Sequence, residues 1–312
     1  MYPEHLVKMI SKRFSLVALY LGLALFSAGA SAASQSRQKR TIGGQEFARG
    51  RWPWLALLRA TIVTHTLFGF LPIRHYHLYC GGVLVSRRWI LTAAHCFTED
   101  GTGGGQPGNW EARLGSVRLR STPGEHLLNI VGRILDDDDL RQWEIDIDTI
   151  ILHPGYNSSN LLSDDIALIR LSDAAPISNI VQPITLPSPT TNGFPYVGQM
   201  CITKGWGCTT SGGNPASRAR EIQLPIYPSR LCSFHFRIGS SSRRLCAGYR
   251  NRNIGVCNGD SGSPLVCMSG SQYTLAGIVS FASRDHPESY PAVFSRVQPY
   301  LPWIHSVISN SS

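Results

Sequence analysis

Short apolar or alternating runs, bounded by Gly, Pro, Ser and Asn, recur along most of this 312-residue chain. Runs of this length and pattern are typical of β-strands, and helical periodicity is scarce, so the pattern predicts an all-β fold. One helix is expected near the carboxyl end, in QPYLPWIHSVI (298–308), where apolar residues repeat at helical spacing. The strand-like runs are WLALLRATIV (54–63), GGVLVSRRWILTAAHC (81–96), DIALIRL (165–171), CITKGWG (201–207), SPLVC (263–267) and YTLAGIVSF (273–281).

The first 40 residues follow a different pattern. Basic residues precede the apolar run 14–26, and the small residues SAGASAA follow it. This order is typical of a secretory signal peptide, predicted here over residues 1–32. An uncleaved membrane anchor is the alternative, but the 13-residue apolar run is shorter than the roughly 20 residues a spanning helix needs. The segment therefore predicts a secreted, extracellular protein with no stable membrane insertion.

Composition and charge narrow the class of protein. Hydrophobic residues make up 43% of the chain and charged residues 16%, which suits a packed core and argues against disorder. The formal net charge is +9, but beyond residue 40 the chain has 23 basic and 19 acidic residues, a net charge of +4. An excess of that size is common on protein surfaces and does not predict a nucleic-acid partner.

Secretion implies an oxidising compartment, so most of the eight cysteines are expected in disulfides. No CxxC pair is present, which argues against zinc. The acidic run 136–139 lacks EF-hand spacing, and His75 and His77 are interpreted as surface-loop residues, so no metal or cofactor is predicted. Asn157 begins an Asn-Ser-Ser sequon in a predicted loop and is a candidate for glycosylation.

Three separate segments supply the groups that amide hydrolysis by a serine requires. His95 lies in LTAAHC, Asp164 and Asp165 in SDDIALIRL, and Ser261 in GDSGSP. In such chemistry a hydroxyl attacks the carbonyl, an imidazole takes the hydroxyl proton, and a carboxylate orients the imidazole. Each residue alone has a more ordinary reading, such as a turn for a serine between glycines.

These segments, together with TIGG (41–44), WPWLALL (52–58), LCAGY (245–249) and GDSGSPLVC (259–267), resemble the chymotrypsin-fold serine proteases, the trypsin-like family. The resemblance runs from Thr41 to about residue 308. It implies two six-stranded antiparallel β-barrels with a C-terminal helix, which form one serine protease domain over residues 41–312.

The resemblance also assigns roles to individual residues. It implies that Ser261 is the nucleophile, His95 the general base and then acid, and Asp165 the orienting carboxylate, with Asp164 a solvated neighbour. The backbone N–H groups of Gly259 and Ser261 would form the oxyanion hole. Ser280 matches the serine that supports the triad aspartate, and strand 280–282 would pair with the substrate backbone.

The segment RQKR before TIGG resembles the family's activation site, which implies a propeptide over 33–40. Cleavage after Arg40 would free the α-amino group of Thr41 to pair with Asp260. The family usually has Ile or Val at the first position, so Thr41 departs from its pattern. A general dibasic processing site that activates nothing is the alternative.

The substrate pocket maps onto Gly255, Val256, Ser280, Ala282 and Ala292. Basic-specific members of the family carry an Asp where this chain has Gly255, so a buried Arg or Lys side chain would lack a partner here. The resemblance of this region to neutrophil elastase favours cleavage after small or medium aliphatic residues. Cleavage after Phe or Tyr is the second reading, and cleavage after Arg or Lys the third.

The family's disulfide pattern implies the pairs Cys80–Cys96, Cys201–Cys267 and Cys232–Cys246. Cys208 and Cys257 are left over, and we hypothesise that they pair with each other, with two free thiols as the alternative.

Three loops are longer than in short members of the family: 59–77, 99–109 and 122–143. Restricted substrate choice and a purely ornamental role both stay open for them. The expected partners are protein or peptide substrates, an activating protease and protein protease inhibitors. A catalytically impaired binding or regulatory protein is the competing function.

Overall fold

The computed structural model divides the chain into Met1–Gln38 and Lys39–Ser312. It describes residues 41–310 except 68–70, 99–103, 136–139, 161, 191–192 and 240. The predicted signal peptide and propeptide, including Arg40, therefore lie outside the described residues, and so does the acidic run 136–139.

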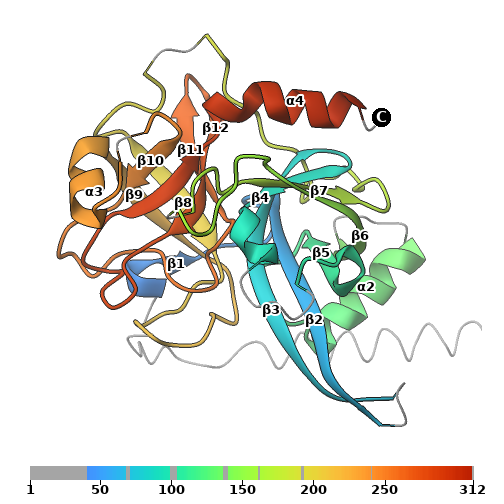
Figure 1. The fold of residues 1–312 in the computed structure, drawn as a ribbon. Helices are drawn as coiled ribbons and strands as arrows, with labels where there is room; N and C mark the ends of the chain where they lie inside the picture. The colour runs from blue at the N-terminus through green and yellow to red at the C-terminus, as the bar shows by residue number, and fades with distance from the viewer. Residues whose placement is uncertain are drawn as a thin grey trace, which may run out of the picture. The chain divides into compact units, whose positions relative to one another are not determined.

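The first half of the described chain forms a closed antiparallel barrel in the order β2-β3-β4-β7-β6-β5 (Figure 1). The apolar runs found in the sequence supply its interior, because alternate side chains of each strand point inward. Leu58, Leu84, Ile90 and Leu168 are among the fully buried side chains. The strands are β2 (Leu55–Leu67), β3 (Leu71–Ser86), β4 (Trp89–Thr92), β5 (Trp110–Leu114), β6 (Trp143–Leu152) and β7 (Ala167–Leu171).

The second half forms another six-stranded barrel, in the order β9-β10-β13-β12-β11-β8, closed because β8 also pairs with β9. The short strand β1 (Gln45–Glu46) adds to the outer edge of β9. The prediction of two six-stranded antiparallel barrels is confirmed. The strands are β8 (Met200–Gly205), β9 (Arg220–Tyr227), β10 (Arg244–Ala247), β11 (Pro264–Ser269), β12 (Gln272–Phe281) and β13 (Ala292–Arg296).

The predicted C-terminal helix is α4 (Leu301–Asn310), with Leu301 and Ile304 buried. Short 3-10 turns lie at Thr41–Gly43, Ala94–Phe97, Pro107–Asn109 and Gln298–Tyr300. Two further helices, α2 (Pro123–Leu135) and α3 (Ser229–Phe236), were not predicted from the sequence. Among the described residues, no helix is long and apolar enough to cross a lipid bilayer.

Two of the three enlarged loops have regular structure. The segment 59–77 extends the β2–β3 hairpin, whose pairing continues to Leu67 and Leu71. The segment 122–143 contains α2, which begins with a capping box: the Thr122 N–H donates to Glu125 Oε2 at 3.0 Å, and the Glu125 N–H donates to Thr122 Oγ1 at 3.4 Å.

Four disulfides join parts of the chain that are distant in sequence. Three are the pairs that the family pattern implies, Cys80–Cys96, Cys201–Cys267 and Cys232–Cys246. The fourth joins Cys208 to Cys257. No free cysteine is found in the described part of the chain.

Candidate active site

The imidazole of His95 is held by Asp165. His95 lies in the 3-10 turn after β4, and Asp165 lies just before β7, the strand that pairs with β4. The His95 Nδ1–H donates to Asp165 Oδ2 at 2.8 Å, and the His95 backbone N–H donates to Asp165 Oδ1 at 2.9 Å. Two bonds fix both the ring and the backbone that carries it. With Nδ1 occupied as a donor, Nε2 is left to accept a proton.

Asp165 is surrounded by hydrogen-bond donors from the second barrel. The Ser280 hydroxyl donates to Asp165 Oδ2 at 2.5 Å, and the Ser295 hydroxyl donates to the Asp165 backbone carbonyl at 2.6 Å. The register of β12 against β13 shifts between Val279 and Phe281, and this irregularity coincides with Ser280. Asp165 is only 1% exposed, so its carboxylate charge is satisfied by the bonds from His95 and Ser280 and not by solvent.

Ser261 lies on a tight turn where the two barrels meet. Its carbonyl accepts a 2.7 Å hydrogen bond from the N–H of Gly81 in β3. Gly259, two residues earlier, has φ +99°, and a Cβ there would lie 2.9 Å from the Trp206 carbonyl oxygen. Both observations explain why only glycine fits at 259. In the part of the chain that the structure describes, the N–H groups of Gly259 and Ser261 have no acceptor, so both can donate to an oxyanion.

His95 and Ser261 share a cavity of about 520 Å³ at this junction. Three residues that the sequence places in the substrate pocket line this cavity: Val256, Ser280 and Ala282. The sequence did not place the other lining residues in the pocket. Three of them, Ser283, Arg284 and Pro287, come from the segment after β12, and the rest are Leu162, Gly212, Cys257, Asn258, Val279 and Phe281.

Gly255 and Ala292, which the sequence predicts in the pocket, do not line this cavity. Gly255 is covered by the loop after β12, because a Cβ built at 255 would lie 2.1 Å from the Pro287 carbonyl oxygen. Ala292 is 3% exposed and packs in the core of the second barrel. Pro287 therefore lines the cavity at the place where the sequence alone predicts Gly255. The carboxylates of the same loop, on Asp285 and Glu288, do not line the cavity either.

Asp260, the residue before Ser261, is buried beneath the turn. Its Oδ1 accepts a hydrogen bond from the Gly207 N–H at 2.8 Å, and its Oδ2 accepts one from the Cys257 N–H at 3.0 Å. Burial raises the pKa of Asp260 to about 6, although the two backbone N–H groups act in the opposite direction. No cation pairs with this carboxylate among the described residues.

Residues 42 and 43 pack against the segment just before Val256, which lines the 520 Å³ cavity. Ile42 is 8% exposed, and its carbonyl accepts a 3.1 Å hydrogen bond from the Gly255 N–H. Gly43 has φ +85° and approaches Ile254 closely. The chain that follows the predicted cleavage point is therefore packed against the segment that leads to Asp260.

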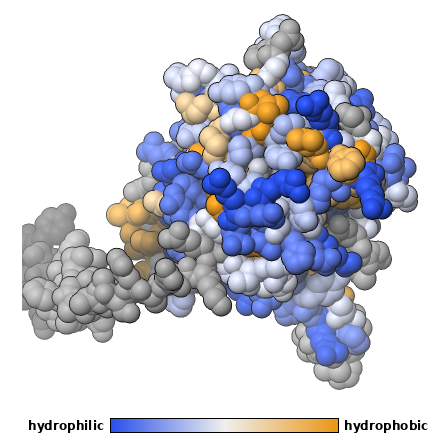
Figure 2. Space-filling view, turned by 90° about the vertical axis from the view of Figure 1, so that its left-hand side faces the viewer, coloured by the Kyte–Doolittle hydropathy of each residue, from blue (hydrophilic) through white to orange (hydrophobic). Residues whose placement is uncertain are grey.

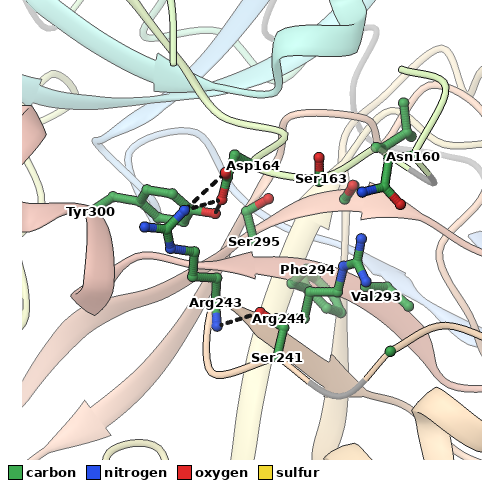
Figure 3. Close-up of a pocket in the computed structure, with 13 residues that line it drawn as sticks. Asn160, Ser163, Asp164, Ser241, Arg243, Arg244, Val293, Phe294, Ser295 and Tyr300 are labelled. Carbon is green, nitrogen blue, oxygen red and sulfur yellow. Dashed lines mark hydrogen bonds and ion pairs between the residues drawn. The ribbon is translucent and has the colours of Figure 1, made fainter. Parts of the chain in front are cut away.

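Asp164 is not the solvated neighbour that the sequence predicts. Its carboxylate accepts two 2.9 Å hydrogen bonds from the Arg243 guanidinium and one of 2.8 Å from the Tyr300 hydroxyl (Figure 3). Asp164 raises the pKa of Arg243 through these bonds, while burial, followed by the bond to Asp164, raises the pKa of Tyr300. These residues border a second cavity of about 310 Å³, and Ser280 and Leu162 line both cavities.

The remaining candidates are placed as follows. Asn157 is exposed, and its side-chain Oδ1 accepts hydrogen bonds from the N–H groups of Ser159 and Asn160. His75 and His77 lie in β3 and border a third cavity of about 730 Å³. Within the described ranges, no group of three or more His, Cys, Asp or Glu side chains is arranged to hold a metal ion.

Known proteins resemble this chain over most of its length. The family model described as Trypsin matches residues 41–304. The chain is 33% identical over 281 residues to Serine protease 41 of Homo sapiens. This alignment covers 86% of this chain and 77% of that protein. It is 34% identical over 266 residues to Transmembrane protease serine 9 of Rattus norvegicus. This alignment covers 85% of this chain but only 21% of that protein. The match to the family model, on a fold of two closed barrels, means that the chain belongs to the trypsin-like family of chymotrypsin-fold serine proteases.

Proposed function

We propose that this chain is a secreted serine endopeptidase that is made as a zymogen and cleaves after uncharged, small-to-medium aliphatic residues. One observation carries the catalytic part: the bond from His95 to the buried Asp165, in a cavity that His95 shares with Ser261. Ser261 attacks the substrate carbonyl, and His95 Nε2 takes the hydroxyl proton and later delivers it to the leaving amine. Asp165 holds the tautomer and stabilises the imidazolium.

The oxyanion of the tetrahedral intermediate would be bound by the N–H groups of Gly259 and Ser261. A preorganised donor of this kind contributes about 2.7–4 kcal/mol to transition-state stabilisation. Ser280 orients Asp165 through the 2.5 Å bond and so acts on the imidazole indirectly.

The buried state of Asp260 supports the proposed activation step. Cleavage after Arg40 would free the Thr41 α-amino group next to Ile42, which already packs against Gly255. An ammonium group that reaches Asp260 would convert a buried, unpaired carboxylate into an ion pair. This gain would favour the shape of the Gly259–Ser261 turn that binds the oxyanion.

The walls of the cavity support a preference for uncharged side chains. Val256, Ala282 and Pro287 are apolar lining residues, and Arg284 also lines the cavity and carries a positive charge. A basic substrate residue would meet Arg284 and no carboxylate, at a cost of several kcal/mol. The signal peptide (1–32), secretion, glycosylation at Asn157, an activating protease and protein inhibitors complete the proposal.

The experiment cleaves the purified chain after residue 40 and adds a fluorophosphonate probe. We expect covalent labelling at Ser261, none in Ser261→Ala, and full labelling in the matched control Ser263→Ala, whose buried hydroxyl has no hydrogen-bond partner among the described residues. Cleavage rates of peptides that differ only in the residue before the scissile bond (Ala, Val, Leu, Phe or Arg) then give the order of preference of the pocket. We expect the Arg peptide to be cut at least about a hundredfold more slowly than the Val peptide, since an unpaired charge would be buried.

Absence of labelling in the cleaved protein would favour the binding-protein reading. Preferred cleavage after Arg would refute the uncharged pocket while leaving the triad intact.

A further inference from the structure

The segment between Ile222 and Gly259 contains six arginines and no lysine, aspartate or glutamate. The mature region as a whole has a net charge of only +4, so this stretch concentrates positive charge on the second barrel. We name these residues the arginine face: Arg230, Arg237, Arg243, Arg244, Arg250 and Arg252.

Most of the arginine face is exposed and unpaired. Arg230, Arg237, Arg250 and Arg252 are exposed, and no carboxylate among the described residues pairs with them. Arg243 is already bound to Asp164. Four guanidinium groups with no carboxylate within ion-pair distance among the described residues create a local excess of positive potential that a bound anion would relieve.

Helix α3 and its C-cap residue carry two of these arginines. Arg230 and Arg237 are seven residues apart, or two helical turns, which places them about 10 Å apart along the axis. Phe234 lies between them at i+4 from Arg230 and is 86% exposed. Arg237 ends the helix with φ +54°. The helix and its C-cap residue therefore carry positive charge at two points along the α3 axis and not at a single site.

The loop that carries Arg250 and Arg252 lies beside α3. The ring of His235, in the last turn of α3, stacks on Tyr290 at 3.8 Å, and the Asn251 N–H donates to the Ser289 carbonyl at 3.1 Å. Burial lowers the pKa of His235, and the nearby charge of Arg250 lowers it further. Figure 2 views the side on which α3 lies in Figure 1, and deep-blue side chains cross the middle of that face.

The row continues to the cavity beside the catalytic cleft. Gly239, two residues past Arg237, lines the 310 Å³ cavity together with Arg243 and Arg244. The Cys232–Cys246 disulfide ties α3 to β10, the strand that begins with Arg244. In Figure 3 the side chains of Arg243 and Arg244 both border this cavity.

From this arrangement we infer that the arginine face binds a linear, sulfated polysaccharide. Guanidinium groups make paired N–H···O bonds to tetrahedral oxyanions, and all six residues are arginine, not lysine. A row of charges suits a polymer whose anionic groups recur at regular intervals better than it suits a single small ion. The choice of an extracellular polymer rests on the secretion that we propose above. Binding would hold the protease on such a polymer while the Ser261 cavity stays on the adjoining surface.

The test measures binding of fluorescent heparin to the full-length Ser261→Ala protein over a range of salt concentrations. We expect saturable binding at about 0.15 M salt, with an affinity that falls steeply as salt rises, because contacts to a polyanion release counterions. The double variant Arg250→Ser/Arg252→Ser should bind about thirtyfold more weakly at that salt, since each lost contact lowers the salt slope by about 0.9.

The matched control is Arg87→Ser/Arg88→Ser, which removes the same charge from an exposed turn between β3 and β4 on the other barrel. This control should bind as the parent does. Equal losses in the two double variants would overturn the proposal, because net charge alone would then explain the binding. So would absence of binding at 0.15 M salt, equal binding of desulfated heparin, or tighter binding of single-stranded DNA or phosphatidylserine vesicles. The Ser261→Ala protein separates this test from the proposed catalytic function.

Discussion

The buried carboxylate of Asp260 should make the stability of the uncleaved chain depend on pH in an unusual direction. Burial raises the pKa of this group from 3.8 to about 6. In the range between those two values the folded protein binds more protons than the unfolded chain, so stability falls as pH rises. Ionising a carboxyl with a pKa raised by about two units costs about 3 kcal/mol of folding free energy once the pH is above 6.

The perturbation is Asp260→Asn in a chain kept uncleaved by Arg40→Ala. Between about pH 5 and pH 7.5, the linkage relation gives the parent a loss of about 1.4 kcal/mol from this group, whereas the Asn variant cannot titrate there. For a domain of this size the loss corresponds to a drop of about 3–6 °C in melting temperature. The Asn amide also loses one acceptor for the N–H groups of Gly207 and Cys257, but that cost does not vary with pH.

Calorimetry measures the melting temperature of both proteins at both pH values. The change with pH in the Asn variant is then subtracted from the change in the parent. Equal pH dependence in the parent and the Asn variant would refute the reasoning. In cleaved Ser261→Ala protein we expect the opposite pH dependence of stability, because an ammonium group beside Asp260 would lower the pKa of the Asp260 carboxyl. The contribution of Asp260 would then be present above pH 4 and lost as the pH falls further.

Two more substitutions test other contacts of the site. Ser280→Ala removes the hydroxyl that donates to Asp165 at 2.5 Å, and kcat/KM of the activated enzyme should fall about tenfold, since a hydrogen bond to a charged group is worth about 1.5–3 kcal/mol; unchanged kinetics would show that the bond does not position the triad. Replacing both Cys208 and Cys257 by serine opens a disulfide with a sequence separation of 49, and urea unfolding should show a loss of about 4 kcal/mol from the chain-entropy term. A loss below about 1 kcal/mol would contradict that expectation.

The barrels could be predicted because the apolar runs that build them are local features of the sequence. The strand DIALIRL begins with Asp165, and the segment LTAAHC contains His95 near its end. Pairing of β4 with β7 brings these two candidate catalytic residues together. The two β-barrels and their closing helix follow from such runs together with the family resemblance.

The helix α2 was missed for a physical reason. Its apolar residues Leu127, Ile130 and Ile134 are spaced for one helical face, but that face is exposed and contributes little to the core. The capping box at Thr122 and Glu125 was the signal that could have found it.

Part of the cavity wall could not be predicted, because it depends on a loop without regular structure. Pro287 and Arg284 reach the cavity only through the path that residues 282–290 take after β12. Likewise, Asp164 and Arg243 are 79 residues apart, and only the packing of the two barrels brings them together.

The contact between Gly255 and the Pro287 carbonyl bears on how this enzyme could be redesigned. Installing an aspartate at 255 is the obvious route to a protease that cuts after arginine. Here the first carbon of that side chain would fall 2.1 Å from a carbonyl oxygen, so the acid could enter only if the segment after β12 were rebuilt at the same time. Conversion to cleavage after arginine would thus require replacement of this loop, and a single substitution at position 255 would not change the preference for uncharged residues that we propose.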